Sequence, residues 1–223
     1  MGTIWLMAAF LAAPPPAALQ TARDQQDRAT LQKIVDESAG AAAKAPNDAE
    51  AQYQMALASS YLAEVALELR DKKLAEQTAE RGVKAAEQAV TLKPDVAEYY
   101  RVLGTLCGQV VPANVLTGLS YGKRAKDAID KAVAKDPKSS PAYMARGVGN
   151  YYLPAAFGGG FDLAVGDFRK SIELDPKNAD AWLWLGLGLK KQNKEAEARQ
   201  AFQKSLELNP RRVWAKQQLD KTP

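Results

Sequence analysis

The sequence predicts an all-α protein built as a right-handed stack of antiparallel helix pairs. Apolar residues recur every three or four positions through residues 179–212, on either side of the polar segment 190–194, which is the pattern of two amphipathic helices and a turn. No segment shows the alternation of apolar and polar residues that is typical of a strand. We therefore expect about nine or ten helices, each pair contacting mainly its neighbours. Prolines that follow helical stretches mark the end of each unit: Pro94, Pro137, Pro176 and Pro210.

The unit at 179–212 carries the clearest motif. Its first helix opens with Trp182 and reads W-x2-L-G-x2-L, and its second helix carries A-x3-F before the closing proline. These spacings resemble those of the tetratricopeptide repeat (TPR) family. Gly186 and Ala198 are small enough to let the two helix backbones approach, and Pro210 ends the second helix because it has no amide hydrogen to donate. The resemblance implies a TPR-type helical solenoid.

Looser copies of the motif precede this unit, and the spacing of their closing prolines lengthens toward the N-terminus. The extra residues fall between the two helices of a pair, so the N-terminal repeats are expected to be expanded. A helix at each end would cap the stack, because the outer face of a terminal repeat must be polar. The expected solenoid spans residues 23–223: an N-terminal cap helix at 24–45, repeats at 50–94, 97–137, 140–176 and 179–212, and a C-terminal cap helix at 211–221.

Residues 1–22 resemble a secretory signal peptide. The apolar run at 3–13 is too short for the roughly 20 residues that span a bilayer as a helix, but it has the length of a signal-peptide apolar core. Small residues follow it, so we expect cleavage near residues 18–23, no integral membrane span in the mature chain, and export to the periplasm or outside the cell. An uncleaved anchor or a mis-assigned start codon are the alternatives, and without cleavage the protein would be cytoplasmic.

The composition excludes several kinds of chemistry. The 223 residues contain no histidine and only one cysteine, Cys107, so a histidine-based triad, a His/Cys zinc site and an intrachain disulfide are excluded. Cys107 is expected in the core. The net charge of +4 comes from basic and acidic residues that are interleaved, as on solvated helix faces, so no nucleic-acid partner is expected. No pair of carboxylates stands out as an acid–base pair. We expect no enzyme activity, no cofactor and no metal.

The resemblance to TPR proteins implies a concave groove, lined by the first helix of each pair, that binds an extended peptide or a partner's helix. Chaperone-binding members of the family hold a carboxylate with a Lys and an Asn. Gln54 and Ala58, and then Arg101 and Thr105, occupy the matching positions here, which argues against that ligand. Lys190 is expected at the rim of the groove. The candidate groove residues are Gln54, Tyr61, Arg101, Thr105, Met144, Val148, Tyr151, Leu187 and Lys190.

The third repeat contains an unusual segment between its two helices, at residues 151–162. Pro154 must interrupt the helix, three consecutive glycines permit a sharp turn, and Asp162 is expected to cap the next helix. The L-P-x-x-F-G-G stretch is similar to one found in periplasmic TPR proteins associated with TRAP-type solute transporters. The repeat, its groove and the absence of catalytic residues predict a protein-binding scaffold. The resemblance of this stretch favours the alternative, a small-solute-binding or accessory component of a periplasmic transport system.

Overall fold

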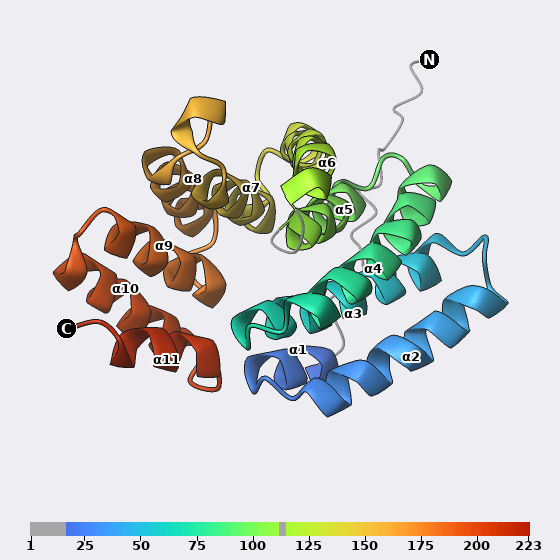
Figure 1. Cartoon of the computed structure of the whole chain (residues 1–223), viewed down its shortest axis with the longest axis horizontal. Coiled ribbons are helices and arrows are strands. Elements are labelled where there is room, and N and C mark those ends of the chain that lie inside the picture. The colour runs from blue at the N-terminus through green and yellow to red at the C-terminus, as the bar shows by residue number, and fades with distance from the viewer. Residues whose placement is uncertain (1–16, 112–114) are drawn as a thin grey trace, which may run out of the picture.

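A computed structural model describes residues 17–111 and 115–223 of the chain, and these ranges contain eleven α-helices, one 3-10 helix and no strand (Figure 1). The all-α prediction is confirmed. None of the described helices is long and apolar enough to cross a membrane. The elements are α1 (Ala17–Asp24), α2 (Arg28–Lys44), α3 (Ala49–Glu68), α4 (Lys72–Leu92), α5 (Ala97–Val110), α6 (Val115–Lys135), α7 (Ser140–Tyr152), η2 (Ala155–Phe157), α8 (Phe161–Leu174), α9 (Ala179–Lys191), α10 (Glu195–Leu208) and α11 (Val213–Asp220).

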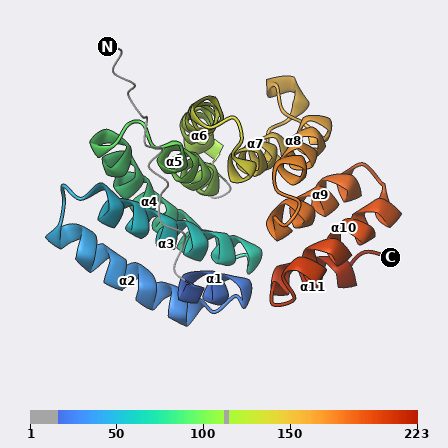
Figure 2. The same cartoon turned by 180° about the vertical axis from the view of Figure 1, so that it is seen from behind.

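The helices pack as four consecutive pairs, α3 with α4, α5 with α6, α7 with α8, and α9 with α10. The first helices of successive pairs also contact one another, so α3, α5, α7 and α9 form one layer. The stack bends until its two ends meet, and both views place α1 beside α11 (Figure 2). The TPR-type solenoid is thus confirmed. Helix α2 lies within residues 24–45 and helix α11 within residues 211–221, the two ranges predicted for cap helices. Helix α1 was not expected, because residues 1–22 were assigned to a signal peptide.

The helix boundaries follow from local signals in the sequence. Pro94, Pro137, Pro176 and Pro210 each lie two residues after the last residue of a second helix. Short polar side chains begin several of the first helices. The Asp48 carboxylate accepts a hydrogen bond from the Glu50 amide (2.9 Å) at the start of α3, and the Asn178 side chain accepts one from the Ala181 amide (3.0 Å) at the start of α9.

The extra residues of the N-terminal repeats are accommodated in two ways. In the first repeat they lengthen the helices, so that α3 has 20 residues and α4 has 21, against 13 for α9 and 14 for α10. In the third repeat they form η2 and the turns around it. The expansion of the early repeats is therefore mostly added helix, which enlarges the surface that each pair buries.

Two hydrophobic cores lie within the stack. The N-terminal core joins helices α1 to α5 and contains the fully buried side chain of Cys107. Burial raises the pKa of the Cys107 thiol to about 11. The thiolate that a nucleophile needs is therefore not available near neutral pH. The C-terminal core joins α8 to α11 around Phe168 and Phe202. The seam between the two cores lies at α6 and α7.

Glycines set the distance between paired helices. A methyl group on Gly147 would lie 2.5 Å from the Phe168 ring, and one on Gly186 would lie 2.5 Å from the Phe202 ring. Both distances are shorter than any carbon–carbon contact that packed side chains tolerate. We expected Gly186 to face Ala198. The structure instead places Phe202 directly against Gly186, and Ala198 is buried in the same core. The same glycine–phenylalanine contact thus recurs in two successive repeats.

We predict that Gly186→Ala and Gly166→Ala change stability in opposite directions. The added methyl group at Gly186 overpacks the contact with Phe202 and should destabilise the protein by about 1–3 kcal/mol. Gly166, on α8, has open space around it, so alanine should stabilise the helix by about 0.5–1 kcal/mol. Chemical denaturation measures both. Hydrogen exchange should show the Gly186→Ala loss concentrated in α9–α11, and a uniform loss over all repeats would contradict neighbour-only packing.

Candidate functional site

A group of aromatic side chains from three helices forms a continuous row in the C-terminal half. Tyr151 and Tyr152 end α7, Trp184 is on α9 and Trp214 begins α11. The ring centroids of Tyr151 and Tyr152 are 5.0 Å apart, those of Tyr151 and Trp184 are 5.8 Å apart, and those of Trp184 and Trp214 are 5.3 Å apart. All three pairs are edge-to-face, the geometry that aromatic rings favour. We call these four residues the aromatic row.

The members of the aromatic row differ in exposure. Tyr151 is half-buried, contacts Phe161 as well as the row, and has its pKa raised to about 12 by burial. Tyr152 is 65% exposed. The pKa of Tyr152 is raised as well, by partial desolvation of its phenol group and by the negative charge of Glu68, so both phenols keep their proton at neutral pH and can donate a hydrogen bond. The row therefore presents one anchored tyrosine and one that is free to touch a partner.

The unusual segment of the third repeat lies beside this row. Gly158 and Gly160 have φ angles of 84° and 119°, which L-residues with side chains rarely adopt, and the Leu153 carbonyl leaves no room for a side chain on Gly159. The expected interruption and sharp turn are confirmed. The expected cap is wrong, because Gly160 precedes α8 and no side chain caps it. The Asp162 carboxylate instead accepts a hydrogen bond from the side-chain amide of Gln192 (2.7 Å), the residue just after α9.

The turn leaves apolar side chains uncovered. Phe157 is 71% exposed and Leu163 is 53% exposed, and a surface hollow of about 630 Å³ runs between the turn, Tyr151, Tyr152 and Gln192. Of the five large apolar side chains that are exposed in the described residues, four lie in this region, and only Leu69 lies elsewhere. Concentrated apolar exposure of this kind is typical of an interaction surface.

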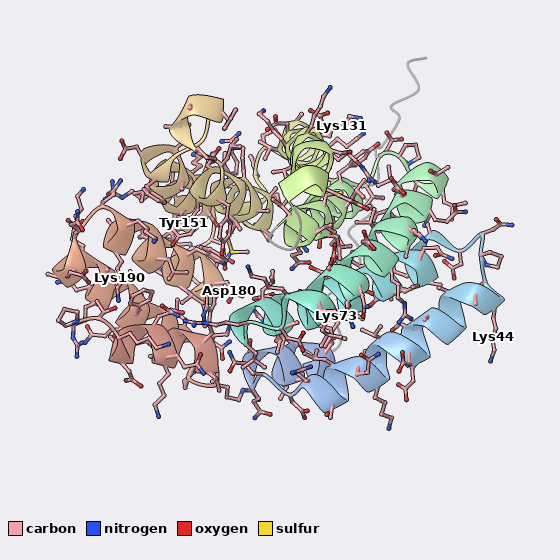
Figure 3. The ribbon with its side chains drawn as sticks, in the orientation of Figure 1. Lys44, Lys73, Lys131, Tyr151, Asp180 and Lys190 are labelled. Atoms are coloured by element: carbon pink, nitrogen blue, oxygen red, sulfur yellow. The ribbon has the colours of Figure 1, made fainter. Side chains whose placement is uncertain are left out.

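The second notable cluster consists of charged residues where the two ends of the stack meet. Arg212, just before α11, has one guanidinium nitrogen 2.6 Å from Glu64 and 2.5 Å from Glu68, both on α3, and another nitrogen 3.3 Å from Asp180 on α9. Arg23 on α1 lies 2.8 Å from Asp180 and 3.0 Å from its neighbour Asp24. Figure 3 labels Asp180 at the point where α9 approaches α3. We call these six residues the ion cluster: Arg23, Asp24, Glu64, Glu68, Asp180 and Arg212.

Burial makes the charges in this cluster interdependent. Arg212 is only 1% exposed and Arg23 only 4%. Burial by itself would lower the pKa of each guanidinium, but the surrounding carboxylates outweigh it and raise both values, so both arginines stay charged. For Asp180, burial opposes ionisation, and the attraction of Arg23 and Arg212 wins and lowers its pKa. The cluster is thus a network of buried ion pairs, in which removing one partner leaves others uncompensated.

The predicted groove residues fall into three groups. In the N-terminal half, Tyr61 lies under the Arg23 guanidinium (5.1 Å from the ring centroid), and Arg101 is held by Glu98 through two hydrogen bonds. Lys190, expected at the rim of the groove, donates to the Lys221 carbonyl (2.6 Å) and to Thr222, so it ties down the C-terminus. Gln54 and Thr105 are partly buried, Gln54 donating to Glu50 (2.6 Å), and four others pack partly buried against the C-terminal core: Met144, Val148, Tyr151 and Leu187.

Sequence reasoning missed the ion cluster entirely. Its members are far apart in the chain, and the contact between Arg23 and Asp180 joins residues 157 positions apart. No local pattern distinguishes Arg212 from Arg211, although only the former is buried. In the described ranges there is also no group of three His, Cys, Asp or Glu arranged to hold a metal ion.

The stacked helix pairs and the repeat motif define a TPR protein, and a model of the tetratricopeptide repeat matches residues 179–212. The chain belongs to the family described as regulator of microtubule dynamics protein 1-3, whose model matches residues 7–153, more than half of the sequence. The family match thus covers the N-terminal half of the stack through α7, and the repeat match covers α9 and α10.

Solved structures support the fold. TTC0263, a thermophilic TPR protein of Thermus thermophilus, is 18% identical with a TM-score of 0.63, over 90% of this chain and 97% of that one. The HusA haemophore of Porphyromonas gingivalis is 20% identical with a TM-score of 0.56, over 80% of this chain and 96% of that one. At these identities the likeness establishes the architecture alone. No curated protein sequence matches the chain.

We predict that the two neighbouring tyrosines contribute unequally to stability. Tyr151→Ala removes a half-buried ring with three aromatic neighbours and should cost about 2–3 kcal/mol in the free energy of unfolding. Tyr152→Ala removes a largely exposed ring and should cost under about 1 kcal/mol. Urea denaturation of the two variants, side by side, tests this. Equal losses would place both rings in the core.

Proposed function

We propose that this chain is a non-catalytic scaffold that binds a protein or peptide segment, and that the aromatic row is its anchor. The observation that carries the proposal is Tyr152, a large aromatic side chain that is 65% exposed beside the packed rings of Tyr151 and Trp184. Tyrosine and tryptophan dominate the residues that supply most of the binding energy in protein interfaces. The TPR fold, which serves widely as a framework for protein–protein interaction, supports the same conclusion.

The surroundings of the row favour a segment of polypeptide as the ligand. The exposed Phe157, Phe161 and Leu163 extend the apolar surface beyond Tyr152, so a partner could place several apolar side chains along it. Arg212 lies against the Trp214 ring (5.5 Å to its centroid) at the other end of the row, with the carboxylates of the ion cluster around it. Arg212 is buried, so the part of this surface that a partner can reach is the apolar one around Tyr152.

Family membership supports a particular candidate partner. The family is described as regulators of microtubule dynamics, and its match includes α7 with both tyrosines of the row. We therefore propose polymerised tubulin as the first partner to test. A scaffold that acts by binding would need no catalytic group.

We predict that Tyr152→Ala weakens binding by about 1–3 kcal/mol, largely through faster dissociation, and leaves the fold intact. Leu69→Ala is the matched control, because Leu69 is also exposed but lies outside the row. Co-sedimentation measures the binding of each variant to microtubules, the first candidate partner. Affinity capture from a lysate with both variants identifies other partners. A partner that binds wild type and Tyr152→Ala equally well would place the binding surface elsewhere.

The hollow of about 630 Å³ favours a second candidate, a small-solute-binding component of a transport system. Its volume lies in the range of roughly 300–1,000 Å³ that is usual for ligand sites, and several apolar residues line it. A bound solute would raise the melting temperature of the protein in a metabolite screen. Phe161→Ala or Leu163→Ala should abolish that rise. If the ligand is instead a protein or peptide, no metabolite should shift the melting temperature, and a polypeptide should be retained in affinity capture.

As the alternative to a cytoplasmic protein that meets microtubules, we also propose an exported form whose partner is not tubulin, with processing earlier than the residue pattern suggests. Cleavage near residues 18–23 would cut α1, in which Leu19 and Ala22 are buried in the N-terminal core and Arg23 and Asp24 belong to the ion cluster. We predict that the mature N-terminus lies at or before Ala17, because a later start would remove these contacts. N-terminal sequencing of the protein from its native cell tests this, and a start at residue 23 would contradict it.

A further inference from the structure

The ion cluster is the joint between the two ends of the stack. Arg212 and Asp180 belong to the C-terminal half, whereas Arg23, Asp24, Glu64 and Glu68 belong to the N-terminal half. The neighbouring contacts across the same joint are also polar. The Asn209 side chain donates to Asp24 (2.7 Å), and the Gln217 side chain donates to Gln26 (3.2 Å). Elsewhere in the stack, neighbouring helices are held by apolar side chains of the two cores.

A joint of this kind differs physically from an apolar one. Buried ion pairs recover the cost of desolvation only while their geometry and protonation states match, so small changes can reverse the balance. The four carboxylates exceed the two guanidinium groups, so the fully ionised cluster has an excess of two negative charges. Opening at the joint would leave each hydrophobic core within its own half, because the two cores are separate clusters, one in α1–α5 and the other in α8–α11. Next to the seam, the halves contact each other through α6 with α7 and through α5 with α7.

We propose that the ion cluster is a latch that holds the two ends of the solenoid together, and that it opens, by movement at the α6–α7 seam, when the cluster loses a proton. Opening would widen the space in front of the aromatic row, since Trp214 adjoins Arg212 and Trp184 adjoins Trp214. The consequence for ligand access rests on the proposed binding function. The latch itself does not.

Glu68 is the group that takes up the proton. Burial, together with the nearby Glu64, raises its pKa to about 7, against the attraction of Arg212 and the hydrogen bond from Gln26. The other groups around it, named from each element, are Arg23 and Asp24 on α1, Asp180 on α9, and Tyr152 on α7. Asp180 is ionised throughout this range, because its pKa is lowered.

The direction of the pH effect follows from this shift. In an opened, solvated form the pKa of Glu68 returns toward its ordinary value of 4.5, so the closed form binds a proton that the open form releases. Closure is therefore favoured as the pH falls toward about 5 and is weakened as the pH rises through about 7. For one group with these two pKa values, the ratio of open to closed molecules should rise about tenfold between about pH 6 and about pH 8.

The distance between the ends can be measured without any partner. Gln25, just after α1, and Lys216, on α11, are exposed and can carry a fluorophore pair as cysteines, with Cys107→Ala removing the native thiol. Single-molecule energy transfer should show one short distance near about pH 6. A second population with a longer distance should grow toward about pH 8, and helical content measured by circular dichroism should stay constant.

Three variants separate the latch from general instability. Arg212→Gln should give the long distance at every pH, because it removes the ion pairs with Glu64, Glu68 and Asp180 together. Glu68→Gln keeps a hydrogen-bond acceptor for Arg212 but cannot titrate, so it should stay closed and lose the pH response. Arg28→Gln, which breaks an exposed ion pair with Asp71, is the matched control and should behave as wild type.

Two results would overturn the proposal. One is a folded Arg212→Gln protein whose ends remain at the short distance. The other is a pH titration between about pH 6 and about pH 8 in which wild type and Glu68→Gln behave alike, either both opening or both staying closed. If Arg212→Gln fails to fold, the wild-type and Glu68→Gln titrations decide alone. A latch that fails these tests leaves the binding proposal intact, and a Tyr152→Ala variant that binds normally leaves the latch intact.

Discussion

The close approach of the two helices in each pair is the constraint on which the rest of the structure depends. Gly147 against Phe168 and Gly186 against Phe202 let a planar ring lie on bare backbone, which draws the helices together and fixes their spacing. Because the same contact recurs in the third and fourth repeats, these two helix pairs have the same close spacing, and each pair is offset from the one before it. The bend of the stack follows from that offset, and the bend brings α1 beside α11 (Figure 1).

This architecture separates two physical roles along the inner helices. In the proposed function, apolar and aromatic side chains at the end of α7 and on α9 supply the surface for contact with a partner. In the proposed latch, buried charges hold the ends of the stack together. Trp214 and Arg212 connect the two, because the tryptophan belongs to the aromatic row and the arginine lies over its ring. Contact surface and closure are therefore coupled through a single short segment. If both proposals hold, the scaffold acts by changing its shape and the exposure of this surface.

The candidate site was predictable from the sequence only in part. Tyr151 and the glycine-rich turn stand out because proline and glycine signal a local departure from the helix, and the structure places the exposed apolar side chains around that turn. Lys190 illustrates the opposite case. The groove positions of the TPR family suggested a rim residue. In the structure the C-terminal segment returns past Lys190, whose ammonium group donates a hydrogen bond to the Lys221 carbonyl. The path of the C-terminal segment therefore decides whether the Lys190 side chain faces solvent or contacts another part of the chain.

The sequence by itself determined the all-α class, the helix pairs and their ends, because apolar periodicity, capping side chains and closing prolines act within a few residues. It also determined that histidine chemistry and an intrachain disulfide are absent, because these need residues that the chain lacks. Only the tertiary structure decided that α1 joins the core and that Arg23 and Arg212 meet the same aspartate, across 157 and 32 positions respectively. The curvature that brings the two ends together is the sum of small rotations between successive repeats, and it cannot be predicted from any local pattern of residues.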